Sequence, residues 1–192
     1  MRKLVYTGFT SLDGVIDSPG GGPGEPHRSA GWVFKDLEFV PEAWTLKGEE
    51  LEDTSALMFG RKSYELFAPT WPGSEDHAAY KELPKYVVST TLPDDAVVDD
   101  WGPITFLRSL DDVAALKQSD GGAIYIHGSG VLAQRLGDAD LIDQYNLLVF
   151  PVLLGAGNSL FGRADRDKRM LSLRESDVYS NGIMKLVYDV KR

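Results

Sequence analysis

The chain has 192 residues, enough for one domain with a sizeable core, and its 29 acidic against 20 basic side chains give a formal charge of −9. This acidity argues against a protein that holds nucleic acid by neutralising many phosphates. The absence of cysteine excludes disulfides, thiolate catalysis and cysteine-based metal sites, and the three histidines lack ligand spacing, so we expect no metal.

Apolar strands alternate with helices over most of the chain. Strands are expected at residues 3–10, 55–59, 85–89, 104–107, 123–127, 142–150, 170–175 and 183–190, and helices at 40–51, 61–67, 109–117 and 129–136. A loop rich in proline and glycine, residues 18–26, follows the first strand. Strands that alternate with helices and then follow each other directly predict a single α/β domain, whose largely parallel sheet ends in an antiparallel edge.

The most informative segment is a short apolar strand, residues 123–127, that leads into Gly128, Gly130 and the start of a helix. Backbone N–H groups and the positive end of a helix dipole converge at such a turn, where phosphate groups bind. With Ala133, the spacing fits G-x-G-x-x-[GA]. A Rossmann domain needs an acidic residue about 20 positions later, but residues 149–152 are apolar. The pattern favours a nucleotide site outside a standard Rossmann domain, with an ordinary strand-to-helix turn as the alternative.

A second candidate element is Arg61-Lys62-Ser63, which follows a strand and Gly60. Cations at the start of a helix oppose its dipole and therefore favour a nearby anion. A phosphate group would supply that anion and would also accept a hydrogen bond from Ser63. The alternative is a solvated helix start whose cations add only solubility. The segment 89–91 carries three hydroxyl groups and, taken alone, is a polar strand exit.

Five short motifs stand in order along the chain: Ser11-Leu12-Asp13-Gly14, Phe59–Glu65, Val88–Leu92, Ile126–Gly130 and Pro151–Gly157. In this order and spacing they resemble the dihydrofolate reductase-like superfamily. The resemblance is greatest to the C-terminal reductase domain of the bifunctional riboflavin-biosynthesis protein, and it covers nearly the whole chain. It implies a three-layer fold with a central, mostly parallel eight-stranded sheet flanked by helices, and a bound NADPH.

The resemblance also implies which residues contact the cofactor: Phe9, Ile16, Gly60, Arg61, Lys62, Ser63, Ser89, Thr90, Gly128, Ser129, Gly130 and Val131. Residues 60–63 would take the 2′-phosphate and part of the pyrophosphate, and residues 89–90 would lie along the adenosine. Residues 128–131 would cradle the pyrophosphate. Phe9 and Ile16 would lie near the nicotinamide.

The substrate side is expected to contain Asp13, Trp44, Pro151 and Leu154. Hydride transfer needs a positioned substrate and a proton source. Asp13 is the candidate catalytic residue, because a carboxylate at the sheet edge can relay a proton or bind a pyrimidine N–H; a loop-forming role before a glycine is equally open. Trp44 stands where true dihydrofolate reductases carry an acid, which argues against folate. Glu42 is nearby, but a carboxylate in the first turn of a helix needs no further role.

The leading hypothesis is an NADPH-dependent reductase of a small heterocycle, most like the 5-amino-6-(5-phosphoribosylamino)uracil reductase of riboflavin biosynthesis. The alternatives are an enzyme similar to dihydrofolate or pterin reductases, and a non-catalytic NADPH-binding protein. Relatives in the riboflavin branch pair through sheet edges, so a homodimer is expected. No apolar run is long enough to cross a membrane and the start of the chain lacks a secretory signal, so we expect a cytoplasmic protein without a membrane partner.

Overall fold

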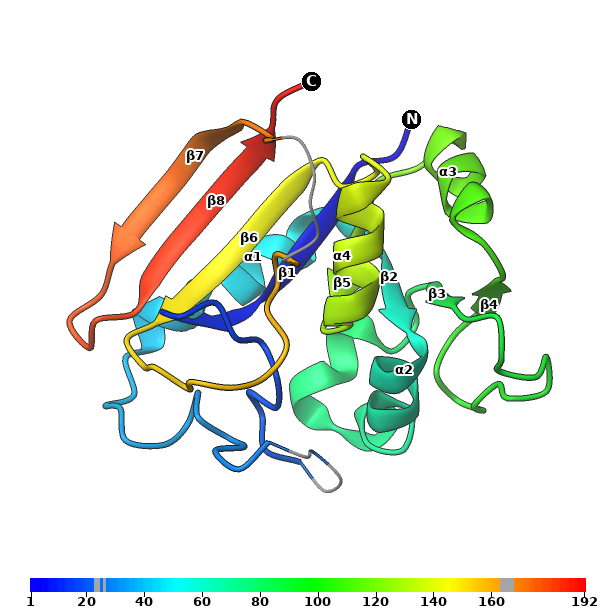
Figure 1. Cartoon of the computed structure of the whole chain (residues 1–192). Helices are drawn as coiled ribbons and strands as arrows, with labels where there is room; N and C mark the ends of the chain where they lie inside the picture. Colours follow the sequence, from blue (N-terminus) through cyan, green and yellow to red (C-terminus); the bar gives the residue numbers. More distant parts are fainter. Residues whose placement is uncertain (23–24, 26, 163–167) are drawn as a thin grey trace.

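Eight strands form one sheet in the part of the chain that the structure, a computed structural model, describes: residues 1–22, 25, 27–162 and 168–192 (Figure 1). The strands are β1 (Leu4–Ser11), β2 (Thr54–Gly60), β3 (Lys85–Val88), β4 (Ile104–Leu107), β5 (Ala123–His127), β6 (Gln144–Phe150), β7 (Leu171–Val178) and β8 (Met184–Val190). Part of the predicted loop 18–26, namely residues 23, 24 and 26, lies outside the described residues.

The order of the strands across the sheet is β4-β3-β2-β5-β1-β6-β8-β7. The first six pair in parallel, whereas β8 runs antiparallel to both β6 and β7. The predicted mostly parallel sheet with an antiparallel C-terminal edge is therefore confirmed. Because β5 lies between β1 and β2, the carboxyl ends of three strands far apart in the sequence meet at one edge of the sheet.

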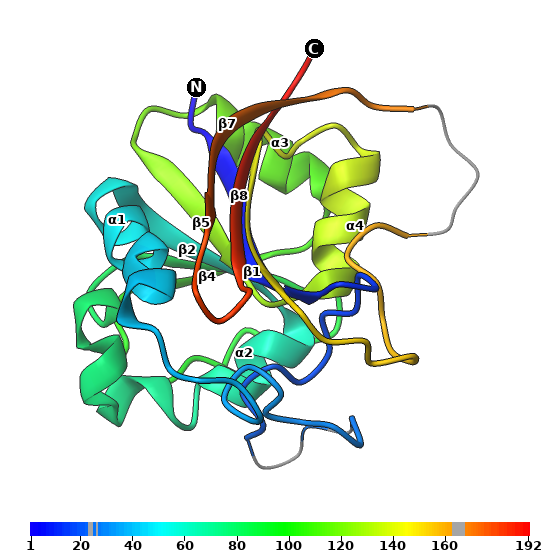
Figure 2. The ribbon, with the colours of Figure 1, turned by 90° about the vertical axis from the view of Figure 1, so that its left-hand side faces the viewer.

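Helices cover both faces of the sheet, as the edge-on view in Figure 2 shows: α1 lies on one side, and α3 and α4 lie on the other. The helices of the described residues are η1 (Pro41–Trp44), α1 (Thr45–Asp53), α2 (Arg61–Phe67), η2 (Trp71–Gly73), η3 (Glu75–Tyr80), α3 (Leu110–Gln118) and α4 (Gly130–Asp138), where η denotes a 3-10 helix. The three predicted layers are confirmed. None of these helices is long and apolar enough to cross a membrane.

The helix predicted at 40–51 is divided in two. Pro41 opens the 3-10 turn η1, and Trp44 at its end precedes the regular helix α1. The start of α3 follows the expectation, because the Ser109 hydroxyl accepts a hydrogen bond from Asp112 N–H (3.1 Å) while the Asp112 carboxylate accepts one from Ser109 N–H (2.9 Å). This reciprocal capping satisfies two N–H groups that the helix itself cannot pair.

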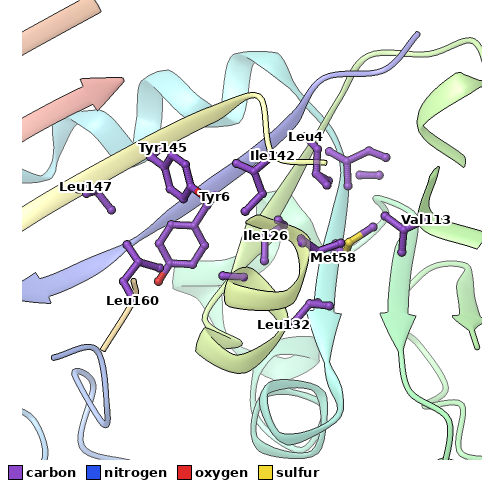
Figure 3. Close-up of a cluster of buried hydrophobic side chains, with 14 of the residues drawn as sticks. Leu4, Tyr6, Met58, Val113, Ile126, Leu132, Ile142, Tyr145, Leu147 and Leu160 are labelled. Atoms are coloured by element: carbon purple, nitrogen blue, oxygen red, sulfur yellow. The ribbon is translucent and has the colours of Figure 1, made fainter. Parts of the chain in front are cut away.

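Side chains on the face of the sheet beneath α3 and α4 form an apolar core (Figure 3). Leu4 and Tyr6 of β1 and Ile126 of β5 are at most 1 % exposed, and they form one cluster with Val113 of α3 and Leu132 of α4. Full burial of an aliphatic or aromatic side chain stabilises a fold by roughly 1.5–3 kcal/mol. This face therefore anchors the strands, and the opposite face carries further apolar clusters together with polar groups.

Candidate active site

The two turns predicted to hold phosphate groups are in direct contact. Because β2 and β5 are parallel neighbours, their carboxyl ends lie side by side. The N–H group of Gly60 at the end of β2 donates a hydrogen bond to Oγ of Ser129, which precedes α4 (2.6 Å). Two segments about 70 residues apart in sequence therefore form one structural unit.

The turn after β5 is an open cradle of backbone N–H groups. Gly128 and Ser129 both have left-handed backbones, with φ of 61° and 60°, and α4 begins at Gly130, one residue later than expected. The Ser129 hydroxyl does not cap α4, because the left-handed backbone of Ser129 differs from the extended backbone of a capping residue; the hydroxyl instead accepts the hydrogen bond from Gly60. The first N–H groups of α4 therefore lack a side-chain partner and can bind an anion.

A side chain at position 128 would close this cradle. A Cβ on Gly128 would lie 2.9 Å from Oγ of Ser63, which is 9 % exposed and has no hydrogen-bond partner among the described residues. A Cβ on Gly130 would lie 2.3 Å from Cδ1 of Ile16, so Ile16 packs over the first residue of α4. An unpaired hydroxyl and a space without a side chain fit a phosphate group of the expected cofactor.

The predicted cations stand at the start of α2, on the solvent side of the cradle. Arg61 donates from Nε to Glu65 (2.8 Å) and from Nη1 to the hydroxyl of Thr91 (2.8 Å), and its other N–H groups stay available. Lys62 is exposed and pairs with no acidic side chain in the described chain. At the end of β3, the buried Ser89 hydroxyl accepts hydrogen bonds from the next turn of backbone, and Thr90 is exposed. Val131 is 52 % exposed beside the cradle.

Asp13 fastens the loop after β1 to the loop after β6. Its carboxylate accepts hydrogen bonds from the Ser11 hydroxyl (2.5 Å), from Gly155 N–H (2.8 Å) and from the N–H of the buried Leu154 (3.2 Å). The bond from Ser11, followed by that from Gly155, lowers the pKa of Asp13. A carboxylate held in its ionised form accepts hydrogen bonds more readily than it donates a proton.

Trp44 lies in an aromatic group at the same end of the sheet. Its ring is nearly parallel to that of Phe34 on a neighbouring loop (centroids 5.5 Å apart) and meets the edges of Phe9 and Phe150 (5.4 and 6.4 Å). Phe9 and Trp44, predicted for the nicotinamide and the substrate, therefore touch. Pro151, in contrast, is exposed and lies close to Gly182 in the β7–β8 hairpin.

The sequence reasoning missed a polar stripe on helix α1. Glu50 is only 3 % exposed, and its carboxylate accepts hydrogen bonds from Thr7 of β1 (2.8 Å) and from Asn146 of β6 (2.8 Å). Lys47, one turn earlier, forms an ion pair with Glu50 (3.1 Å). The three-residue spacing of Trp44, Lys47 and Glu50 was the available signal, because it places all three on one side of a helix.

His127 ends β5 beside this stripe. Thr7 is its neighbour on β1, and the rings of Trp71 and Tyr80 pack against the imidazole at 5.8 and 5.4 Å. Burial, with a smaller contribution from the charge of Lys47, lowers the pKa of His127 to about 3. The imidazole is therefore neutral at pH 7. No group of three or more possible metal ligands occurs in the described part of the chain.

Comparison with known proteins identifies the family of the chain. The model of the RibD C-terminal domain family matches residues 2–185. The chain belongs to this family. The family includes the predicted branch of the dihydrofolate reductase-like superfamily, so the expected resemblance is confirmed. Among curated relatives, the uncharacterised protein YyaP of Bacillus subtilis is 27 % identical over 195 residues, which cover 97 % of this chain and 94 % of YyaP.

Solved structures in and near the family share the fold. A protein from Shewanella sp. PV-4, provisionally assigned to riboflavin biosynthesis, is 25 % identical with a TM-score of 0.75, over 99 % of both chains. The dihydrofolate reductase of Enterococcus faecalis, solved with NADP(H) and RAB-propyl, has a TM-score of 0.61 at 15 % identity, over 99 % of this chain and 97 % of the enzyme. The second likeness concerns the fold alone.

The cradle can be tested with a pair of glycine substitutions. Gly128→Ala introduces a Cβ at a left-handed position and close to Ser63, so we expect a loss of about 1–2 kcal/mol in the free energy of unfolding and weaker nucleotide binding. Gly48→Ala is the control, because this exposed glycine inside α1 has open space around its Cβ position; we expect a gain of about 0.5–1 kcal/mol. Denaturant unfolding measures the free energy of unfolding of both variants. Equal changes in the two variants would contradict the cradle.

The neutral state of the partly buried His127 predicts a pH dependence of stability. Between pH 6.5, the usual value, and about pH 3, the unfolded chain binds a proton at this residue that the folded chain does not. The free energy of unfolding therefore falls as the pH falls, by up to about 1.4 kcal/mol per pH unit from this group. We expect the free energy of unfolding of His127→Asn, measured with urea, to change less between pH 6.5 and 4.5 than that of the natural chain. His27→Asn should leave this slope unchanged. Equal slopes for all three proteins would refute this account.

Proposed function

We propose that this protein is an NADPH-dependent reductase of a small heterocycle. The contact between Gly60 and Ser129 carries the proposal, because it joins a cationic helix start and an open glycine turn, which together offer donors for two phosphate groups. Membership of the RibD C-terminal domain family supports a reductase. The dihydrofolate reductase with the same fold, which was solved with NADP(H), supports the choice of cofactor.

In this proposal the residues of the chain divide the cofactor among them. Residues 128–131 hold the pyrophosphate through backbone N–H groups, and Arg61 and Lys62 bind the 2′-phosphate together with residues 60 and 63. Ser89 and Thr90 follow the adenosine, and Phe9 and Ile16 form the wall at the nicotinamide. NADPH, when bound, supplies the hydride; the protein contributes orientation and exclusion of water.

The substrate lies on the side of Asp13, Trp44, Pro151 and Leu154. Trp44, whose ring stacks with those of Phe34 and Phe39, contributes an aromatic wall on this side. The ionised Asp13 acts by accepting a hydrogen bond from a ring N–H, because its low pKa disfavours a role as proton donor. The known reaction that the family suggests is the reduction of 5-amino-6-(5-phosphoribosylamino)uracil in riboflavin biosynthesis.

The preference for NADPH over NADH is the first test. We expect the protein to bind NADPH at least about tenfold more tightly than NADH, because only NADPH carries the 2′-phosphate that Arg61 and Lys62 meet. In the double variant Arg61→Ala/Lys62→Ala, affinity for NADPH should fall about 10- to 100-fold while that for NADH stays unchanged. Isothermal titration calorimetry measures all four affinities, with Lys191→Ala as a control cation. Equal affinity of the natural chain for the two nucleotides would contradict the proposal.

We also propose that the protein works as a homodimer in the cytoplasm. The edge strand β7 offers unpaired backbone groups to a second copy, since all but its first residue are exposed. Light scattering coupled to size-exclusion chromatography should then give twice the mass of one chain. A single-chain mass at micromolar concentration would refute the dimer.

A further inference from the structure

Glu50 is a buried carboxylate that accepts three hydrogen bonds. One of its oxygens accepts from Asn146 Nδ2 (2.8 Å), and the other accepts from the Thr7 hydroxyl (2.8 Å) and from Lys47 Nζ (3.1 Å). An ionised group at 3 % exposure needs such compensation, because burial of an unpaired charge costs several kcal/mol. At 3 % exposure Glu50 offers a ligand little access, and its role is to hold its neighbours.

Lys47 is different, because about a quarter of its side chain, 23 %, stays exposed. Its ammonium group has three N–H donors, of which Thr7 Oγ1 and Glu50 Oε2 take two. No third acceptor for it exists among the described residues. Nζ lies 5.3 Å from the ring centroid of Phe9, and its charge is felt by His127. The free donor thus lies between the expected nicotinamide wall and the strand end that leads into the glycine turn.

The charges around this donor favour a neutral ligand. The ammonium of Lys47 and the carboxylate of Glu50 cancel, and the neighbouring imidazole of His127 is neutral. A pair without net charge attracts an anionic group little more than a neutral one, but it still offers a directional, charge-assisted hydrogen bond. A carbonyl oxygen is the acceptor that suits such a donor.

We propose that Lys47 binds a ring carbonyl oxygen of the substrate through its third N–H group, and that Glu50 is the positioning residue that holds Lys47 for this contact. The proposal rests on the proposed function, whose substrate is a small heterocycle. It makes Lys47 a specificity-determining residue, since a ring that carries an amino group in place of the carbonyl presents a donor to a donor. Such a mismatch leaves polar groups unpaired and lowers affinity.

A matched pair of probes tests this assignment: 6-aminouracil, with ring carbonyls, and 2,4,6-triaminopyrimidine, with amino groups in their place. At pH 8, with and without NADPH, we expect the natural chain to bind 6-aminouracil at least about tenfold more tightly by calorimetry. The double variant Lys47→Met/Glu50→Gln removes the donor without leaving a buried charge, and it should lose the preference. Lys191→Met, at the exposed end of the chain, should keep it.

Glu50→Gln alone tests the positioning role. Without this carboxylate the ammonium group of Lys47 is no longer held in place, so Glu50→Gln should lower the preference for 6-aminouracil over 2,4,6-triaminopyrimidine. A merely structural role would weaken the binding of both probes equally and leave their ratio unchanged. Circular dichroism confirms that each variant is folded.

Three results would overturn the assignment: no binding of 6-aminouracil to the natural chain, no preference for it over 2,4,6-triaminopyrimidine, or an unchanged preference in the double variant. The proposed function fails separately, through NADPH binding. If NADPH does not bind but the carbonyl preference depends on Lys47, the assignment of Lys47 is retained and the cofactor assignment is wrong. If NADPH binds and the preference is absent, only the role of Lys47 is wrong.

Discussion

The position of β5 between β1 and β2 is the constraint on which the candidate site depends. All three strands are parallel, so Ser11, Gly60 and His127 end at one edge of the sheet although they lie far apart in the sequence. The bond from Gly60 N–H to Ser129 Oγ joins the two turns, and the Ser129 hydroxyl makes no capping bond to α4. The N-terminus of α4 beside the joined turns therefore stays open to an anion.

Both faces of the sheet carry apolar clusters, and the face toward α1 also meets the polar stripe on that helix. Beneath α3 and α4, β1 contributes Leu4 and Tyr6 to an apolar core, which provides much of the stability of the fold. On the face toward α1, Thr7 of the same strand meets Glu50 instead. Because side chains of a strand alternate between faces, a single strand can anchor the core and carry polar groups into a cleft. The cost of burying Glu50 is offset by three hydrogen-bond donors.

Much of the fold follows from local pattern, since apolar runs mark the strands and Ser109 with Asp112 marks the start of α3. The turns at 60–63 and 128–131 were also predictable, because glycine and clustered cations have local meaning. The polar stripe was not, because Glu50 meets Asn146 across 96 residues of sequence. The spacing on α1 shows which side chains share a side, but only tertiary packing decides what that side faces. Two of the three partners of Asp13 were hidden for the same reason, since they lie more than 140 residues away.

A crystal structure of the protein with NADP⁺ at saturating concentration tests the central claim most directly. The account predicts pyrophosphate oxygens within hydrogen-bond distance of the backbone N–H groups at the start of α4, and the 2′-phosphate beside Arg61 and Lys62. A nucleotide bound elsewhere on the molecule, or one whose phosphates avoid the turn at Gly128, would contradict it.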